Sequence, residues 1–210
     1  MIYLDSAIIA EAEIVRSWGW VKGITTNPTL LAKSELSAED TLKQLRLLTS
    51  GELYYQLTAT TFEDMVLEGR KAYKLIGEQT VLKIPATNVG FQVTAKLSQE
   101  IPCAVTAIYS GAQTAIAVEA GAKYAIAYVN RATRLLGDGL ALVREMAQLV
   151  AHSDTKILAA SLKSPQEAAD ALQAGAHHLT LPLEGLEAMT THELSQQTVQ
   201  EFNEKGRGIV

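Results

Sequence analysis

A lysine stands in the middle of an apolar run at residues 80–87, TVLKIPAT. Lysine is rarely buried unless a partner neutralises it or the protein uses its amine. Burial strips water from the ammonium group and lowers the pKa of a lysine toward neutrality. A neutral amine can add to a carbonyl carbon and form a Schiff base. Lys83 is therefore a candidate nucleophile, and the alternative is a lysine that only forms a buried ion pair.

Other polar side chains interrupt short apolar runs in the same way. Asp5 could exchange protons near Lys83, or it could be the ion-pair partner of that lysine. Tyr128 could donate the proton of its phenol, although a buried tyrosine is often a core residue with a satisfied hydroxyl. Gln56 could orient a water molecule or serve as a hydrogen-bonded core residue. The same pattern singles out Thr25, Thr26, Asn27, Thr106, Asn130, Arg131 and Ser161.

Two of these residues suit a phosphate group. Arg131 and Ser161 each come at the end of an apolar run, just before a segment with helical character. A guanidinium fork, a hydroxyl and the amides of a helix N-terminus together bind phosphate well. The alternative for Arg131 is an arginine on a solvated loop.

The candidates lie in eight short β-branched or apolar runs that alternate with helical patterns. Ser37 is a good N-cap for one helix, and Ser164 with Pro165 begins another that Gly175 ends. A long amphipathic segment at 184–204 is expected to break near Thr190. The eight runs are 2–6, 23–26, 53–57, 80–86, 103–109, 124–129, 156–161 and 177–183.

Strands that alternate with helices indicate parallel βαβ units. We expect a single domain over residues 1–210, a (β/α)8 TIM barrel with an extended C-terminal helix. A doubly wound open sheet is the alternative, but it would normally carry a glycine-rich turn after the first strand, where this chain has SAIIAE. Barrel enzymes place catalytic residues on inward positions at the carboxyl ends of the strands. The interrupting polar residues are expected to meet there.

Composition narrows the class of protein. The net charge of −5 argues against binding to nucleic acid or to an anionic membrane. One cysteine, Cys103, leaves no intrachain disulfide, and the N-terminus lacks the basic region of a signal peptide. We therefore expect a cytoplasmic protein. The four histidines form no metal-binding motif, so neither a metal nor a cofactor is expected.

Taken together and in order, the motifs resemble a known family along essentially the whole chain. The chain is similar to the small transaldolase group and, within it, to the fructose-6-phosphate aldolase branch. The motifs that carry the resemblance are YLDS at 3–6, GITTNPTLL at 23–31, YQLTAT at 55–60, VLKIPAT at 81–87, TAIYS at 106–110, YVNR at 128–131, AASLKS at 159–164 and LTLPL at 179–183.

The resemblance implies a class I aldolase, in which Lys83 on the fourth strand is the Schiff-base lysine. Asp5 would position that lysine or exchange protons with it. Tyr128 would be the acid/base residue of the aldolase branch, and Gln56 also matches that branch. Thr106 would share a water molecule with Gln56 and Tyr128.

The resemblance also implies a division of the substrate contacts. Thr26 and Asn27 lie in the segment that binds donor hydroxyls, and Arg131 with Ser161 would hold the phosphate of the acceptor aldehyde. Two residues depart from the family pattern and are expected to shape the pocket. Ile126 replaces a small residue and Ala104 replaces a larger one, so the choice of donor is left open.

The implied reaction is cleavage or formation of fructose 6-phosphate from dihydroxyacetone, or a related small ketone, and glyceraldehyde 3-phosphate. The alternatives are a transaldolase, a phosphosugar-binding barrel without turnover, and an isomerase with Asp5 as its base. The resemblance also implies a homo-oligomer, a decamer of two pentamers. The C-terminal helix at about 192–204 would contact a neighbouring subunit, or else pack on its own barrel.

Overall fold

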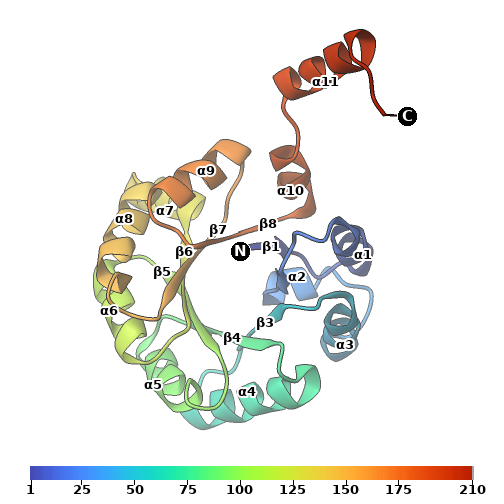
Figure 1. The fold of residues 1–210 in the computed structure, drawn as a ribbon. Helices are drawn as coiled ribbons and strands as arrows, with labels where there is room; N and C mark the ends of the chain where they lie inside the picture. The colour runs from blue at the N-terminus through green and yellow to red at the C-terminus, as the bar shows by residue number, and fades with distance from the viewer. Residues whose placement is uncertain (210) are drawn as a thin grey trace.

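Eight parallel strands close into a barrel in the computed structural model, which describes residues 1–209 (Figure 1). Each strand pairs with the next one along the chain, and β8 pairs with β1 to close the ring. This confirms the predicted (β/α)8 barrel. The strands are β1 Ile2–Asp5, β2 Gly23–Thr25, β3 Glu52–Gln56, β4 Thr80–Pro85, β5 Cys103–Ile108, β6 Tyr124–Tyr128, β7 Lys156–Ala160 and β8 His178–Leu181.

Helices surround the barrel, and their ends follow the sequence signals. Ser37 accepts a hydrogen bond from the amide of Asp40, and Ser164 accepts one from Glu167, so both predicted N-caps form. The helices are α1 Ile9–Trp18, α2 Pro28–Leu31, α3 Ala38–Leu48, α4 Phe62–Ile76, α5 Asn88–Leu97, α6 Gly111–Glu119, α7 Val129–Leu136, α8 Gly139–Val150, α9 Pro165–Gln173, α10 Leu183–Met189 and α11 Glu193–Lys205.

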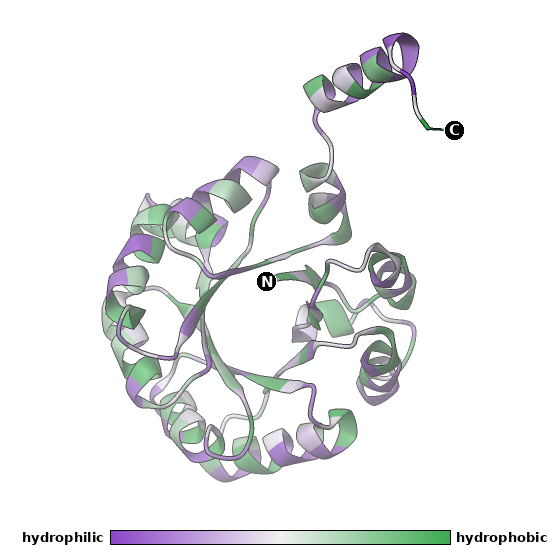
Figure 2. Cartoon of the chain, viewed as in Figure 1, coloured by the Kyte–Doolittle hydropathy of each residue, from purple (hydrophilic) through white to green (hydrophobic). Residues whose placement is uncertain are grey.

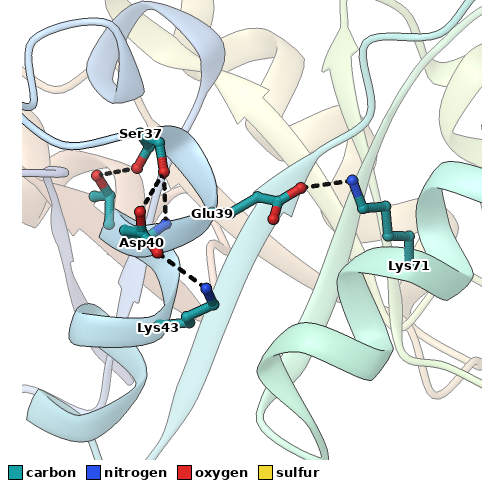
Figure 3. A network of polar contacts seen from close by, with 6 residues as sticks. Ser37, Glu39, Asp40, Lys43 and Lys71 are labelled. Carbon is teal, nitrogen blue, oxygen red and sulfur yellow. Dashed lines mark hydrogen bonds and ion pairs between the residues drawn. The ribbon is translucent and has the colours of Figure 1, made fainter.

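A surface network ties α3 to α4 (Figure 3). Ser37 and Lys43 both bond the Asp40 carboxylate at the start of α3, at 2.8 and 2.9 Å. Glu39 pairs with Lys71 of α4 across the gap between the two helices. All of these side chains are exposed, and exposed ion pairs contribute less than about 1 kcal/mol each. The network therefore adds little to the stability of the helix ring.

The strands sort their side chains to two faces with a period of two. On β4, Leu82 and Ile84 face outward and pack against helix residues such as Leu97. Lys83 lies between them and faces inward, as the predicted strand parity requires. The interior is filled by a separate apolar cluster of Tyr3, Tyr54, Val81, Ala104, Tyr124, Ile126, Leu158 and Ala160.

A partly buried carboxylate organises the amino end of the barrel, and sequence reasoning did not find it. Glu52 accepts hydrogen bonds from the phenols of Tyr3 (2.8 Å), Tyr54 (3.0 Å) and Tyr124 (2.8 Å). Lys123 completes the set with an ion pair of 2.7 Å. Burial alone would raise the pKa of the Glu52 carboxyl, but these donors outweigh it and hold the pKa below its ordinary value.

The C-terminal segment breaks where it was expected to, between α10 and α11. Helix α11 stands away from the barrel and packs on none of it (Figure 1), and none of its residues is buried. Its apolar and polar residues are interspersed along its length (Figure 2). Among residues 1–209, no helix combines the length and the apolar character that crossing a membrane would need.

Candidate active site

A pocket of about 520 Å³ opens at the carboxyl ends of the strands. It contains Lys83 and most of the residues that the sequence singled out. This is the end of a (β/α)8 barrel where catalytic residues are found. The predicted residues that line it are Asp5, Thr25, Asn27, Gln56, Lys83, Ile126, Tyr128, Arg131 and Ser161.

The amine of Lys83 is held by a neutral group. The side chain is 4% exposed, and its Nζ donates to the backbone carbonyl of Thr26 over 2.8 Å. Within residues 1–209, no ion pair joins Lys83 to Asp5 or to any other carboxylate. The geometry is therefore not that of the buried ion pair considered from sequence.

The segment after β2 supports the site differently from the expectation. Thr26 does not line the pocket with its side chain, because its hydroxyl donates to the carbonyl of Tyr54 over 2.7 Å. It reaches the site only through the carbonyl that holds Lys83. Asn27 lines the pocket but also caps α2, since its Oδ1 accepts from the amide of Leu30 over 3.0 Å. The amide nitrogen of Asn27, which bonds to nothing among residues 1–209, is left to face a ligand.

Tyr128 and Gln56 line the pocket with polar groups, and the buried Thr106 supports Tyr128. The hydroxyl of Thr106 donates to the Tyr128 oxygen over 3.0 Å, which leaves the phenol proton of Tyr128 available to the pocket. The side-chain oxygen of Gln56 is buried and has no hydrogen-bond partner in the part of the chain that the structure describes. A buried, unpaired acceptor costs about 1–3 kcal/mol unless a water or a ligand satisfies it. The oxygen of Gln56 is therefore available to accept a hydrogen bond from a water or a ligand.

Two residues beside the pocket adopt left-handed backbone conformations. Ala107 (φ 59°) follows Thr106 at an irregularity in the pairing of β5 with β6, and Ser161 (φ 58°) ends β7. Such conformations cost a non-glycine residue roughly 1–2 kcal/mol. Strain of this kind collects at functional sites, where it aims particular groups. Nothing in the sequence signals it, because glycine is absent from both positions.

Positive charge lies beside Tyr128 in the same pocket. The guanidinium of Arg131, at the start of α7, lies over the ring of Tyr128, 5.1 Å from its centre. Ser161 lies nearby on the pocket wall, and Lys163 lines the same pocket. Sequence reasoning missed Lys163, although it stands inside the quoted motif AASLKS. Arg134 does not line the pocket.

The two residues predicted to shape the pocket lie at different depths. Ile126 lines the pocket, two residues before Tyr128 and on the same face of β6. Ala104 pairs in register with Lys83 but lies in the apolar interior cluster rather than on the pocket wall. Ile126 is therefore the one of the two that a bound ligand would touch.

Asp5 belongs to a chain of hydroxyls that sequence reasoning found only in part. Thr25 donates to Asp5 over 2.7 Å and lies 2.6 Å from the hydroxyl of Thr180 on β8. Thr180 interrupts the apolar run LTLPL as the other candidates interrupt theirs, so the same criterion would have found it. In residues 1–209, no three His, Cys, Asp or Glu side chains gather as a metal ion would need.

The fold and the pocket define a (β/α)8-barrel protein whose candidate site lies at the carboxyl ends of the strands. A family model described as transaldolase/fructose-6-phosphate aldolase matches residues 2–208. The chain belongs to this family, and the names of its relatives indicate a transaldolase-like enzyme.

The relatives match over nearly their whole length. A protein named "Probable transaldolase" from Anaeromyxobacter sp. (strain Fw109-5) is 34% identical over 95% of this chain and 94% of its own. One with the same name from Hydrogenobaculum sp. (strain Y04AAS1) is 35% identical over 95% of this chain and 93% of its own. A third, from Aquifex aeolicus (strain VF5), is 32% identical with the same two coverages.

Solved structures share the fold at low sequence identity. A crystal structure of mandelate oxidase with benzoyl-formic acid aligns with a TM-score of 0.64 and 16% identity. Another, with 3,3-difluoro-2-hydroxy-3-phenylpropionic acid, gives the same two values. The alignment covers 87% of this chain but spans only 64% of the oxidase chain in both cases. At this identity the likeness concerns the barrel alone.

Proposed function

We propose that the protein is a class I aldolase that cleaves and forms fructose 6-phosphate through a Schiff base on Lys83. The observation that carries the proposal is the environment of this lysine. Its amine is buried at the base of a polar pocket, held by a carbonyl and paired with no carboxylate among the described residues. An amine held in this way, with no carboxylate bound to it, is placed to add to the carbonyl carbon of a ketone.

The first half of the reaction forms an iminium on Lys83, which later accepts the electron pair of the broken carbon–carbon bond. The Lys83 nitrogen adds to the ketone carbon of the sugar phosphate, and the carbonyl oxygen takes a proton from the pocket. Asp5 removes a proton from the nitrogen and returns it to the new hydroxyl. That hydroxyl leaves as water while the nitrogen lone pair forms the iminium. Arg131, Ser161 and Lys163 hold the phosphate in this scheme.

The second half breaks the carbon chain. A base removes the proton of the C4 hydroxyl, and the electron pair of the C3–C4 bond flows into the iminium to give an enamine. Tyr128 is the candidate for that base, through a water that Gln56 and Thr106 hold. Glyceraldehyde 3-phosphate leaves first. The enamine is then protonated at C3 and hydrolysed, which releases dihydroxyacetone and regenerates Lys83.

A transaldolase is the second candidate, and the names of the curated relatives favour it. In that reaction the enamine attacks a second aldehyde instead of being protonated. Tyr128 and Gln56 are the residue types of the aldolase branch in the resemblance, and they favour release to water. The test is release of glyceraldehyde 3-phosphate from fructose 6-phosphate with and without erythrose 4-phosphate. Release without the second sugar phosphate supports the aldolase, and strict dependence on it supports the transaldolase.

Two further functions, neither of which forms a Schiff base, can be distinguished by experiment from the aldolase and the transaldolase. A phosphosugar-binding barrel would bind fructose 6-phosphate without turning it over. An isomerase that uses Asp5 as its base would convert the sugar phosphate without releasing a three-carbon product. In either case Lys83→Met would leave the behaviour nearly intact. Product formation by the wild type would exclude the binding barrel. Loss of all product in Lys83→Met, with binding retained in calorimetry, would exclude the isomerase.

We also propose a homo-oligomer, a decamer of two pentamers, in which α11 packs on a neighbouring copy. The support is an apolar set on α11 that the protomer leaves uncovered. Leu194 is 64% exposed and Phe202 is 68% exposed, and Val199 accompanies them. Exposed apolar residues of this size are typical of interfaces.

Light scattering of Phe202→Asp tests this assembly, because a charge on that face would be buried in the contact. The expected result is a smaller particle than the wild type. The matched control is Glu204→Gln, a polar exchange on the same helix that should keep the assembly. A monomeric wild type would contradict the proposal.

A further inference from the structure

Two buried threonines connect the Asp5 carboxylate to the last strand of the barrel. β1 pairs with β2 on one side and with β8 on the other, with Asp5 in register with Thr25 and Tyr3 in register with Thr180. The hydroxyl of Thr25 donates to Asp5 Oδ1 over 2.7 Å. The same hydroxyl lies 2.6 Å from the hydroxyl of Thr180. Both threonines are buried and both line the pocket.

The direction of this chain follows from counting protons. A hydroxyl has one proton to donate and two lone pairs to accept with. Thr25 spends its proton on Asp5, so in its contact with Thr180 it can only accept. Thr180 must therefore be the donor of the second bond. The two hydrogen bonds therefore point the same way, from Thr180 through Thr25 to Asp5 Oδ1, and each bond polarises the next.

The two oxygens of Asp5 consequently have different surroundings. Oδ1 accepts from Thr25, and Oδ2 accepts nothing from residues 1–209. Among those residues, the side-chain oxygen of Gln56 is the one buried polar side-chain atom without a partner. The unbonded Oδ2 is therefore not buried and faces the open pocket. A proton on Oδ1 would leave Thr25 without its acceptor, so Oδ2 is the oxygen on which Asp5 can carry a proton.

We infer that Thr180 is a positioning residue that, through Thr25, restricts proton exchange by Asp5 to Oδ2. The inference rests on the proposed function and names the atom that performs one of its steps. Oδ2 takes the proton from the carbinolamine nitrogen and delivers it to the hydroxyl. The C–O bond then breaks, water leaves, and Asp5 returns to the carboxylate as the iminium forms. Without Thr180, Thr25 turns freely and both oxygens of Asp5 compete for the proton.

The test is the rate at which borohydride traps the Schiff base formed with dihydroxyacetone. Thr180→Val keeps the shape of the side chain and removes its donor. We expect trapping to slow about tenfold, which corresponds to the loss of one hydrogen bond of about 1.4 kcal/mol in the transition state. The acidic limb of the pH–rate profile should move to higher pH. Thr180→Ser, which keeps the hydroxyl, should restore the wild-type rate to within about twofold.

A double-mutant cycle shows whether Thr180 acts through Thr25. Thr180→Val should slow trapping about tenfold in the wild type and hardly at all in a Thr25→Val background, because the link is already gone. An equal effect in both backgrounds would overturn the inference. So would an unchanged trapping rate and an unchanged acidic limb in Thr180→Val. Thr180→Ala serves as a second variant if Thr180→Val does not fold, and melting temperatures identify that case.

The outcomes separate this inference from the proposed function. If the wild type forms no adduct with dihydroxyacetone or hydroxyacetone, the aldolase proposal fails and the inference fails with it. If the adduct forms at the same rate in every threonine variant, only the inference fails.

Discussion

At the scale of single residues, the pocket is distinguished by polar groups that lack ionic partners or a full set of hydrogen bonds. Lys83 bonds to a carbonyl, Asp5 has one oxygen without a donor, and Gln56 has an unpaired oxygen within the described residues. A core that existed only for stability would pair these groups with each other, because unpaired buried polar groups cost free energy. The arrangement is explained if these groups form their remaining hydrogen bonds with a bound ligand.

Tyr128 supplies the first prediction. Tyr128→Phe removes the phenol that we assign to proton transfer at C4, and general acid–base groups contribute about 10²–10⁴-fold. Cleavage of fructose 6-phosphate should fall by about 10²-fold or more, whereas borohydride should still trap the Schiff base. Steady-state release of glyceraldehyde 3-phosphate measures the first effect, and intact mass measures the second. An equal loss of cleavage and of adduct would assign Tyr128 to Schiff-base formation instead.

Ile126 supplies a prediction about specificity. Its side chain lines the pocket beside Lys83, so Ile126→Ala should enlarge the space for the donor. One methylene group in an apolar pocket is worth about 1–3 kcal/mol, or roughly 10–200-fold in discrimination. Bulkier donor ketones should gain relative to dihydroxyacetone in a panel of kcat/KM values. Ala104→Val is the matched comparison, because Ala104 lies in the interior cluster and should affect stability more than donor choice.

The sequence identified most of this site because one criterion, a polar residue that interrupts an apolar strand, is also the criterion for facing the barrel interior. It failed where one residue has two roles. Asn27 reads as a ligand-binding residue but spends its oxygen on a helix cap, and Thr26 contributes its carbonyl rather than its hydroxyl. Backbone strain at Ala107 and Ser161 leaves no trace in residue type.

At the scale of elements, strand parity and helix caps decide which groups reach the pocket. The strand ends agree with the predicted runs to within two residues. Several runs are followed at once by a helix-capping residue, as at Asn27, Thr87 and Ser110. The short helix α2 is the exception that the periodicity could not reveal, since four residues make little more than one turn. Its cap is Asn27, so the element and the site depend on the same side chain.

Asn27 therefore gives a prediction that separates the cap from the ligand contact. Asn27→Asp keeps the oxygen that caps α2 and loses the amide donor that faces the pocket. Its melting temperature should stay near that of the wild type while KM for fructose 6-phosphate rises. Asn27→Ala should lose both, with about 1 kcal/mol of stability lost with the cap. If Asn27→Asp binds substrate as the wild type does, the residue is a cap only.

At the scale of the whole molecule, the two ends of the barrel differ: one holds the candidate site, and the other holds a network of structural hydrogen bonds. The amino end is organised by Glu52 and three tyrosines, and the carboxyl end holds the pocket. The sequence predicted the closed barrel from the strand–helix alternation. It could not predict the Glu52 cluster, because its members come from three strands that only the barrel register brings together.

The amino end gives a prediction about pH. Burial, aided by the nearby positive amine of Met1, lowers the pKa of His178 from its ordinary 6.5 to about 4. The folded protein keeps His178 neutral in that interval, whereas the unfolded chain takes up a proton. The stability contribution is therefore complete above pH 6.5 and is lost progressively as the pH falls to about 4.

Thermal melting between pH 7 and pH 5 checks this prediction, because Glu52 protonates only at lower pH. The melting temperature of the wild type should fall by a few degrees over that range, and His178→Gln should flatten the decline. His152→Gln, which replaces an exposed histidine, is the control and should keep the wild-type slope. An identical slope in His178→Gln and the wild type would contradict the assignment.

We propose that Lys83 forms a covalent imine with a small ketone, and borohydride trapping tests this directly. The protein is incubated with dihydroxyacetone and borohydride, and the site of the mass increase is mapped by peptide mass spectrometry. One irreversible adduct is expected on Lys83, absent from Lys83→Met and retained by Lys96→Met, which changes an exposed lysine on α5. An adduct that persists in Lys83→Met, or no adduct in the wild type, would contradict it.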